Sequence, residues 1–198
     1  PSPGVEQAVA DLLVARGVVH PVPRPGPVGD VEVVIPAYEN PDLLDACLAS
    51  LTADCPGVPV IVVDDASADP AVGRVALAHG ATLVRHDRNR GPAAARNTGL
   101  GRVQASIVAF VDADCVVTPG WLEVLTAHFG DPRVAAVAPR ISPRPNGSSA
   151  LVRYQVARSS LDMGPRPELV THGAPLGFLP SAALLVRCSA RPSFDEQL

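Results

Sequence analysis

Two aspartates separated by one residue are the side chains of this sequence that point most clearly to a chemical role. Asp112-Ala113-Asp114 directly follows residues 107–111, an unbroken apolar run of strand length. Such a run is typical of a central strand in a parallel sheet, and open α/β sheets bind ligands just past the carboxyl ends of these strands. Neighbouring carboxylates repel each other, and their oxygens suit Mn²⁺ or Mg²⁺, which also bridge to phosphate oxygens. The pair therefore predicts a metal site with Asp112 and Asp114 as ligands, and an acidic solvated turn is the simpler alternative.

Three other polar segments also follow apolar runs, at residues 36–40, 64–69 and 89–99. In the first of them, Pro36 and the aromatic ring of Tyr38 would pack beside a nucleotide base. The Gly-x-Gly-x-x-Gly motif of dinucleotide-binding sites does not occur there. This segment therefore favours contact with a base, and the alternative for Tyr38 is an ordinary surface aromatic.

Asp65 and Arg96 are the charged candidates in the other two segments. A carboxylate at a strand end can accept the ring N–H of a pyrimidine, whereas adjacent aspartates with a serine also make a stable polar turn. Gly91 allows close approach of the backbone, and the helix that starts there attracts anions at its N-terminus. Arg96, further into that helix, can reach a phosphate or a ribose hydroxyl, or can simply pair with a surface acid.

The order of predicted elements is that of an α/β protein with a mainly parallel, Rossmann-like sheet flanked by helices. Strands are predicted at residues 31–36, 58–63, 81–85, 106–111, 134–138 and 182–186, and helices at residues 5–19, 41–51, 69–79, 91–103, 119–129 and 151–163. Short connections between alternating elements require parallel strands with right-handed crossovers, so the strand-end loops gather at one edge. Gly17 is expected to end the first helix, Leu43 to face the core and Asp69 to be an N-cap. Residues 1–29 are predicted to form an N-terminal helix and a Pro-rich linker, and residues 30–198 the core.

Composition limits the classes of protein to which the chain can belong. Its 198 residues suit one domain, 47% are hydrophobic, and the net charge of −4 gives no basic footprint for nucleic acid or for a membrane surface. The four cysteines form no Cys-x-x-Cys pair, which suits free thiols in a reducing cytoplasm. No signal peptide or membrane-spanning run is visible. We therefore expect a cytoplasmic protein, with a peripheral position at a membrane as the alternative, and a piece of a longer chain because there is no initiator Met.

Four ordered motifs at consecutive strand ends resemble family 2 glycosyltransferases of the GT-A fold. The motifs are Val-Val-Ile-Pro-Ala-Tyr-Glu-Asn at 33–40, Val-Val-Asp-Asp-Ala-Ser-Ala-Asp at 62–69, Asn-Arg-Gly-Pro-Ala-Ala-Ala-Arg-Asn-Thr-Gly at 89–99 and Phe-Val-Asp-Ala-Asp at 110–114. The resemblance implies a UDP-sugar donor and a bound Mn²⁺ or Mg²⁺ ion, for which Asp114 is the better ligand and Asp112 the second. The nucleotide contacts that it implies are Pro36, Ala37, Tyr38, Glu39, Asp65, Arg96, Asp112, Ala113 and Asp114.

Later segments resemble the mycofactocin glycosyltransferase subgroup of this family. Residues 137–140, 159–167 and 180–187 carry this second resemblance. It implies transfer of a hexose, glucose in that subgroup, from a UDP-sugar to a hydroxyl acceptor, a precursor of a peptide-derived redox cofactor. It also implies that Ser181 and Ala182 lie on the acceptor side.

The resemblance further implies an inverting reaction with one acidic residue as base. In the family this base lies in a Glu-Asp pair that follows a segment like Phe194-Asp195-Glu196. We therefore expect the base beyond Leu198, with Asp195 and Glu196 at a frayed end, and donor binding without turnover by these residues. Two alternatives stay open, a nucleotidyltransferase, which normally has a Gly-rich basic loop after the first strand, and a nucleotide-sugar-binding domain without turnover.

Overall fold

The computed structural model describes residues 3–16, 19–144, 147, 149–150, 152, 154, 158–170 and 176–197. The chain forms two compact units. The larger unit consists of Arg24–Pro139 and Ser181–Leu198, and the smaller unit of Pro1–Pro23 and Arg140–Pro180. The larger unit contains the whole sheet and every strand-end motif singled out above. None of the helices in the described parts of the chain has the length and apolar composition needed to cross a membrane.

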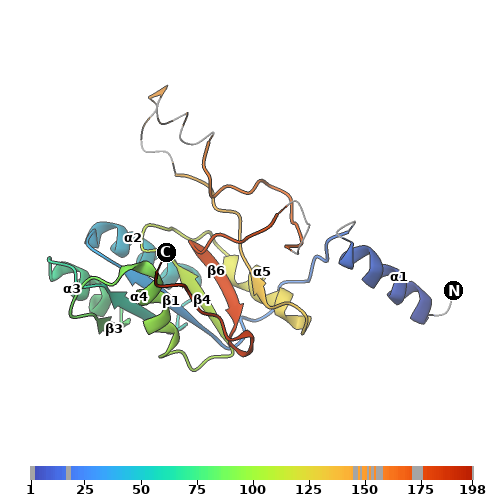
Figure 1. The fold of residues 1–198 in the computed structure, drawn as a ribbon, viewed down its shortest axis with the longest axis horizontal. Helices are drawn as coiled ribbons and strands as arrows, with labels where there is room; N and C mark the ends of the chain where they lie inside the picture. The colour runs from blue at the N-terminus through green and yellow to red at the C-terminus, as the bar shows by residue number, and fades with distance from the viewer. Residues whose placement is uncertain are drawn as a thin grey trace. The chain divides into compact units, whose positions relative to one another are not determined.

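Six strands form one sheet in the order β3-β2-β1-β4-β6-β5. They are β1 (Val31–Ala37), β2 (Val60–Asp64), β3 (Thr82–Arg85), β4 (Ile107–Val111), β5 (Ala136–Val137) and β6 (Ala183–Arg187). Strands β1 to β4 pair in parallel, and β6 pairs antiparallel with both β4 and β5. Figure 1 shows β1 and β4 in the middle of this sheet, with β6 next to β4. The mainly parallel sheet predicted from the alternating elements is therefore confirmed.

Helices cover both faces of the sheet, which explains why its central strands are apolar throughout. The larger unit contains α2 (Pro41–Asp54), α3 (Ala71–Ala78), α4 (Gly91–Leu100) and α5 (Trp121–Ala127), with the short 3₁₀ helices η1 (His128–Gly130) and η2 (Cys188–Ala190). The remaining helix, α1 (Pro3–Ala15), belongs to the smaller unit. One apolar cluster joins Ile107, Ala109 and Val111 of β4 to α2, α3 and α5. The other cluster joins Val108 and Phe110 to α4. All of β4 is buried, so a polar substitution on either face would leave an unsatisfied group in the core.

Most helix ends differ from the predicted ones by a few residues, and two of the differences concern residues named above. α3 begins at Ala71 with Pro70 as its N-cap. The carboxylate of Asp69 still accepts the backbone N–H of Ala71, at 2.8 Å, but does so from one position before the cap. α1 ends at Ala15, and Gly17, which was expected to end it, lies outside the described residues.

Two further expectations are wrong. The helix predicted at residues 151–163 does not extend over residues 158–163, which form turns and irregular structure. Residues 150, 152 and 154 are helical, and the positions between and just after them lie outside the described residues. Leu43, expected to face the core, is 47% exposed, because at the first turn of α2 it borders the cavity at the sheet edge, whereas Leu44 and Cys47 are buried.

Helix α4 lies unusually close to the sheet because it carries a glycine at the contact. A Cβ atom added to Gly99 would overlap Cγ1 of Val34 in β1 and would lie 3.3 Å from Cγ2 of Val63 in β2. Both valines are fully buried and cannot move aside without disturbing the strands that they belong to. Gly99 therefore sets the distance between α4 and the sheet, and with it the position of every side chain that α4 presents at the sheet edge.

We expect Gly99→Ala to lower the free energy of unfolding by about 1–3 kcal/mol, the usual cost of overpacking a core. Gly101→Ala is the matched control, because the nearest atoms to its added Cβ are backbone oxygens at an ordinary 3.6 Å. That control should change stability by no more than about 0.5 kcal/mol. Urea denaturation of both variants measures the difference, and equal effects would show that α4 is not closely packed at Gly99.

Candidate functional site

A cavity of about 370 Å³ opens at the carboxyl edge of the parallel strands. It is bounded by the segments that follow β1, β2 and β4 and by the first turns of α4. Every residue predicted to contact a nucleotide lines it, namely Pro36, Ala37, Tyr38, Glu39, Asp65, Arg96, Asp112, Ala113 and Asp114. The predicted contacts did not include Asn40, Leu43, Asn89, Gly91, Pro92 and Ala95, which also line the cavity; all of them except Leu43 lie within the recognised motifs.

The loop after β1 is tied to the loop after β2. The backbone N–H of Glu39 donates to Oγ of Ser67 at 2.9 Å, and the Glu39 carboxylate accepts the N–H of Ala68 at 2.8 Å. Glu39 and Asn40 both have a φ of 53°, in the left-handed region, which turns the chain sharply away from the strand. Tyr38 remains 52% exposed at the cavity wall, so its ring is available for stacking while Glu39 holds the two loops together.

The adjacent aspartates after β2 have different partners. Asp64 is fully buried, accepts the N–H of Ser67 at 2.9 Å and forms an ion pair with Arg85 of β3. Asp64 does not line the cavity, so its role is to close the loop. Asp65 is also buried but borders the cavity, where its position permits contact with a ligand.

Three donors orient the Asp65 carboxylate. Its Oδ1 atom accepts hydrogen bonds from Nδ1 of His86 at 2.7 Å and from the backbone N–H of Arg90 at 2.9 Å. Its Oδ2 atom accepts the backbone N–H of Gly91 at 2.7 Å. Gly91 has a φ of +86°, a conformation in which other residues are strained, and this allows its N–H to point at the carboxylate. The loop before α4 therefore holds Asp65 in one orientation.

Arg96 of α4 and Asp112 after β4 form the central ion pair of the site. The Nη2 atom of Arg96 donates to Oδ1 of Asp112 at 2.5 Å, and its guanidinium lies over the ring of Phe194, 5.4 Å from the centroid. Burial raises the pKa of the Asp112 carboxyl above its ordinary value, Arg96 counteracts this, and the charge of Asp114 raises it again. Among the described residues, the buried Nε atom of Arg96 has no hydrogen-bond partner. Arg96 as a whole still borders the cavity, where its guanidinium can meet a ligand.

Asp114 is the exposed member of the carboxylate pair, and it faces the cavity with Asp112. The neighbouring Cys115 thiol donates to Asp114 at 3.8 Å. Burial, and then the charges of Asp114 and Asp112, raise the pKa of Cys115 to about 12. At neutral pH this thiol is therefore protonated and does not supply a thiolate ligand. The donor set is one of carboxylate oxygens, which suits a hard cation such as Mg²⁺ or Mn²⁺.

A divalent cation fits this donor set only with a second source of ligands. In the parts of the chain that the structure describes, no three His, Cys, Asp or Glu side chains gather to form a complete metal site. Mg²⁺ is commonly held by one or two carboxylates together with substrate phosphates and water, rather than by an all-protein cage. Asp112 and Asp114 are compatible with that arrangement.

Ser181 and Ala182, expected on the acceptor side, are not among the residues that line the cavity. Ala182 is buried, and its backbone oxygen accepts the N–H of Asp112 at 2.8 Å and lies 3.5 Å from Sγ of Cys115. This contact holds the Asp112 backbone in line with the β4–β6 pairing. The structure thus brings Ala182 next to the carboxylate pair through its backbone, and an acceptor role for either residue stays a prediction.

The segment from Phe194 to Glu196 is anchored, contrary to the expectation of a frayed end. Asn97 of α4 donates to the backbone oxygen of Phe194 at 2.8 Å and accepts its N–H at 2.9 Å. Glu196 accepts a hydrogen bond from Asn97 at 2.9 Å and pairs with Arg90 at 3.1 Å. The hydrogen bond from Asn97 is the first cause that lowers the pKa of the exposed Glu196 carboxyl. Sequence reasoning missed this contact because Asn97 and Phe194 are far apart in the chain.

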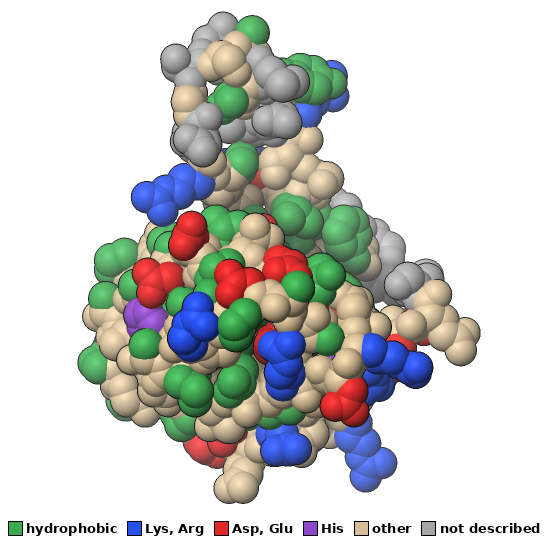
Figure 2. All heavy atoms as spheres, turned by 90° about the vertical axis from the view of Figure 1, so that its left-hand side faces the viewer, with side chains coloured by type: hydrophobic (Ala, Val, Ile, Leu, Met, Phe, Trp, Pro, Cys, Tyr) green, Lys and Arg blue, Asp and Glu red, His purple; other side chains and the backbone are tan. Residues whose placement is uncertain are grey.

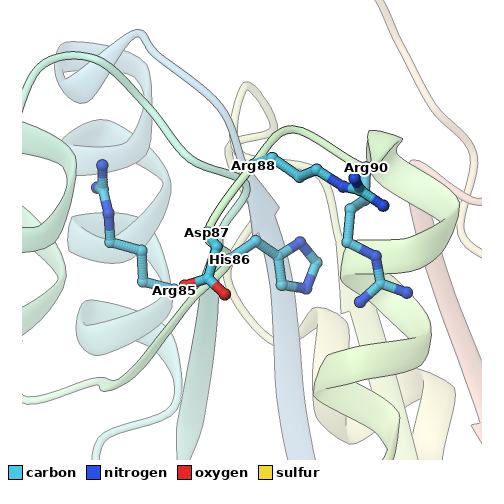
Figure 3. Close-up of a pocket in the computed structure, with 5 residues that line it drawn as sticks. All are labelled: Arg85, His86, Asp87, Arg88 and Arg90. Atoms are coloured by element: carbon cyan, nitrogen blue, oxygen red, sulfur yellow. The ribbon is translucent and has the colours of Figure 1, made fainter.

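A second, open hollow of about 570 Å³ lies beyond the end of β3. Its lining residues are Arg85, His86, Asp87, Arg88 and Arg90. Figure 3 shows Arg85 directed to one side of this segment and Arg88 and Arg90 to the other, with the His86 ring directed toward α4. The arginines do not converge on one point. Figure 2 shows acidic and basic side chains interspersed on the face of the molecule that includes α3 and β3.

The chain matches known glycosyltransferases in sequence and in fold. The sequence profile of the family described as Glycosyl transferase family 2 matches residues 32–185. The chain is 42% identical, over 98% of its length, to a pre-mycofactocin glycosyltransferase of Mycobacterium tuberculosis, and it spans only 42% of the length of that relative. A shorter match, 39% identical over 46% of the chain and 27% of the relative, is to the succinoglycan biosynthesis protein ExoO of Rhizobium meliloti.

Solved structures with the same fold include two bound to nucleotides. The mannosyltransferase PcManGT of Pyrobaculum calidifontis, in complex with GDP-Man and Mn²⁺, superposes with a TM-score of 0.67 at 24% identity, covering 96% of this chain and 55% of that one. TarS of S. aureus in complex with UDP has a TM-score of 0.66 at 20% identity, covering 85% and 51%. The fold is thus of the GT-A type, and the chain belongs to glycosyl transferase family 2.

Proposed function

We propose that the longer protein is an inverting glycosyltransferase that transfers a hexose from a UDP-sugar to a hydroxyl acceptor. The observation that carries this proposal is the cavity at the carboxyl edge of the sheet, which is lined by all the residues predicted to bind the nucleotide. Such an edge is where open α/β sheets bind their ligands. Family membership and the nucleotide-bound proteins of the same fold support the same reaction class.

In this proposal the nucleobase of the donor lies between Tyr38 and the segment that begins α4. The Oδ2 atom of Asp65 accepts the ring N–H of the base, because it has one protein donor and borders the cavity. Arg96, whose guanidinium borders the cavity, donates to the ribose or a phosphate. TarS was solved with UDP and PcManGT with GDP-Man, and uracil and guanine both present a ring N–H, so Asp65 is suited to either base.

Asp114 and Asp112 would hold a Mn²⁺ or Mg²⁺ ion, with Asp114 the principal ligand because Asp112 already pairs with Arg96. A divalent cation supplies Lewis-acid stabilisation of the charge that develops on the leaving nucleoside diphosphate. The contribution of the chain is to orient this carboxylate pair through Arg96 and through the backbone of Ala182. The Mn²⁺ in the PcManGT complex supports the assignment.

We expect Asp114→Asn to weaken the Mn²⁺-dependent affinity for UDP by at least roughly tenfold. Mutation of a residue that only hydrogen-bonds to a metal ligand already lowers metal affinity by about that factor. The amide keeps the shape but removes the charge that offsets desolvation of the cation. Calorimetric titration of UDP with and without Mn²⁺ measures the effect. Asp87→Asn, at the exposed hollow beyond β3, is the control and should leave the affinity unchanged. Equal affinities of the Asp114 variant and the parent protein would refute the metal assignment.

We propose glucose as the sugar and a mycofactocin precursor as the acceptor, because of the likeness to the pre-mycofactocin glycosyltransferase. The nucleotidyltransferase alternative is less favoured, since the loop from Pro36 to Asn40 lacks the Gly-rich, basic sequence that such enzymes use for the triphosphate. The other alternative, a nucleotide-sugar-binding domain without turnover, applies to these 198 residues by themselves if the catalytic base lies elsewhere in the protein. The cytoplasmic location stays a prediction.

The catalytic base of the proposed reaction, which deprotonates the acceptor hydroxyl, lies outside the described residues in this proposal. Of the carboxylates that line the cavity, Glu39 holds the loop after β2, Asp112 pairs with Arg96, and Asp65 and Asp114 are assigned to the donor and its cation. Glu196 is anchored to α4 with a lowered pKa, which makes it a weaker base.

We therefore expect the 198-residue chain to bind UDP-glucose but to transfer sugar about 10²–10⁴ times more slowly than the longer protein, the usual contribution of a positioned base. Mass spectrometry of a mycofactocin precursor incubated with each protein, UDP-glucose and Mn²⁺ compares the two rates. Donor binding measured in parallel is the control, and it should be similar. Transfer at similar rates would place the base within these residues, and Glu196 and Asp195 would then be the first candidates.

A further inference from the structure

His86 is a buried imidazole that the proposed reaction does not use. Its side chain is only 6% exposed. Its Nδ1 atom is 2.7 Å from Oδ1 of Asp65, and its Nε2 atom is 2.9 Å from Oγ1 of Thr98 in α4. Figure 3 shows the ring directed from the end of β3 toward α4. His86 therefore links three elements, because Asp65 follows β2 and Thr98 belongs to α4.

The contact with His86 leaves only one oxygen of Asp65 with room for a ligand. An ionised carboxylate has about four acceptor positions, two on each oxygen. His86 and the backbone N–H of Arg90 occupy both positions on Oδ1, and the backbone N–H of Gly91 occupies one on Oδ2. The remaining position is on Oδ2, and Asp65 borders the cavity.

The hydrogen bonds also indicate how His86 is protonated. The oxygen of an ionised carboxylate is only an acceptor, so Nδ1 must carry the proton that His86 donates to Asp65. The Thr98 hydroxyl, which can donate or accept, then meets Nε2 in either charge state of the ring. Thr98 thereby keeps the ring in the rotamer that directs Nδ1 at Asp65.

We propose that His86 is a positioning residue that sets the base preference of the nucleotide site through Asp65. This inference rests on the proposed nucleotide-binding function. With Oδ1 saturated, the carboxylate presents a single acceptor to the cavity, and a base with a ring N–H at its pairing edge, such as uracil or guanine, satisfies it. Cytosine presents an unprotonated ring nitrogen there, so two acceptors would face each other. Sites of this kind reject the analogue that leaves buried polar groups unpaired.

Removal of the His86 ring should therefore weaken discrimination between bases rather than binding as a whole. Without the donor from His86, the Asp65 carboxylate can rotate, and Oδ1 gains an open acceptor position that the amino group of cytosine can fill. We expect His86→Leu to reduce UDP affinity roughly tenfold, to bring the UDP-to-CDP affinity ratio close to one and to leave pyrophosphate affinity unchanged. His86→Asn is the conservative variant, because its amide nitrogen occupies the chain position of Nδ1 and can donate to Asp65. It should restore most of the ratio.

The test is calorimetric titration of UDP, CDP and pyrophosphate, each with Mn²⁺, into the parent protein and both His86 variants. A uniform loss for all three ligands, or a ratio that the Asn variant does not restore, would overturn the positioning role and leave His86 as part of the packing. Thr98→Val carries the same test if the Leu variant does not fold, and it should lower the ratio in the same direction but by less.

Asp65→Asn separates failure of this inference from failure of the proposed function. The two donors at the Oδ1 position keep the amide oxygen there, so the amide nitrogen takes the place of Oδ2 as a donor and should abolish the preference for UDP over CDP. If it does so while His86→Leu keeps the parent ratio, the base site stands and the positioning role of His86 is refuted. If Asp65→Asn itself keeps the ratio, Asp65 does not contact the base, and the positioning role of His86 falls with that assignment, whereas a parent protein that binds no UDP at all would overturn the proposed function.

Discussion

Parallel pairing of β1 to β4 is the constraint on which the rest of the structure depends. The register places Ala37 opposite Asp64 and Asp64 opposite Arg85, so neighbouring strands end at nearly the same level. Strands in a sheet are only about 4.8 Å apart, and the loops that leave them at one edge must therefore touch. The contacts between the loops after β1 and β2, and the pairing of Asp64 with Arg85, follow from this geometry.

The same edge concentrates carboxylates that could not be buried there without partners. Three of them receive a donor from another element: Asp64 from Arg85 of β3, Asp65 from His86 just after β3, and Asp112 from Arg96 of α4. A buried charge that is paired and hydrogen-bonded is tolerated, whereas an unpaired one costs several kcal/mol. The carboxylates of Asp65, Asp112 and Asp114 also border the cavity, and in the proposal a nucleotide and its cation bind to them there.

The sequence was a good guide wherever the pattern was local. The apolar run of β4 predicted a strand buried on both faces, and the four strand-end motifs predicted which residues line the cavity. It could not identify the partners of Asp64 and Asp65, because Arg85 and His86 come from another strand end. The spacing of apolar residues likewise predicted too long a helix at residues 151–163. There the helical periodicity competes with the segment rich in Gly and Pro that follows it.

The central claim is that the carboxylate pair binds a cation together with a nucleotide at this edge. Nuclear magnetic resonance of the ¹⁵N-labelled protein with sub-stoichiometric Mn²⁺ tests it directly, because the paramagnetic ion broadens nearby amide signals. Our account predicts that broadening centres on Ala113, Asp114 and Cys115, spreads to Asp65 and Gly91, and becomes strong only when UDP is added. Broadening centred elsewhere, or unaffected by UDP, would contradict it.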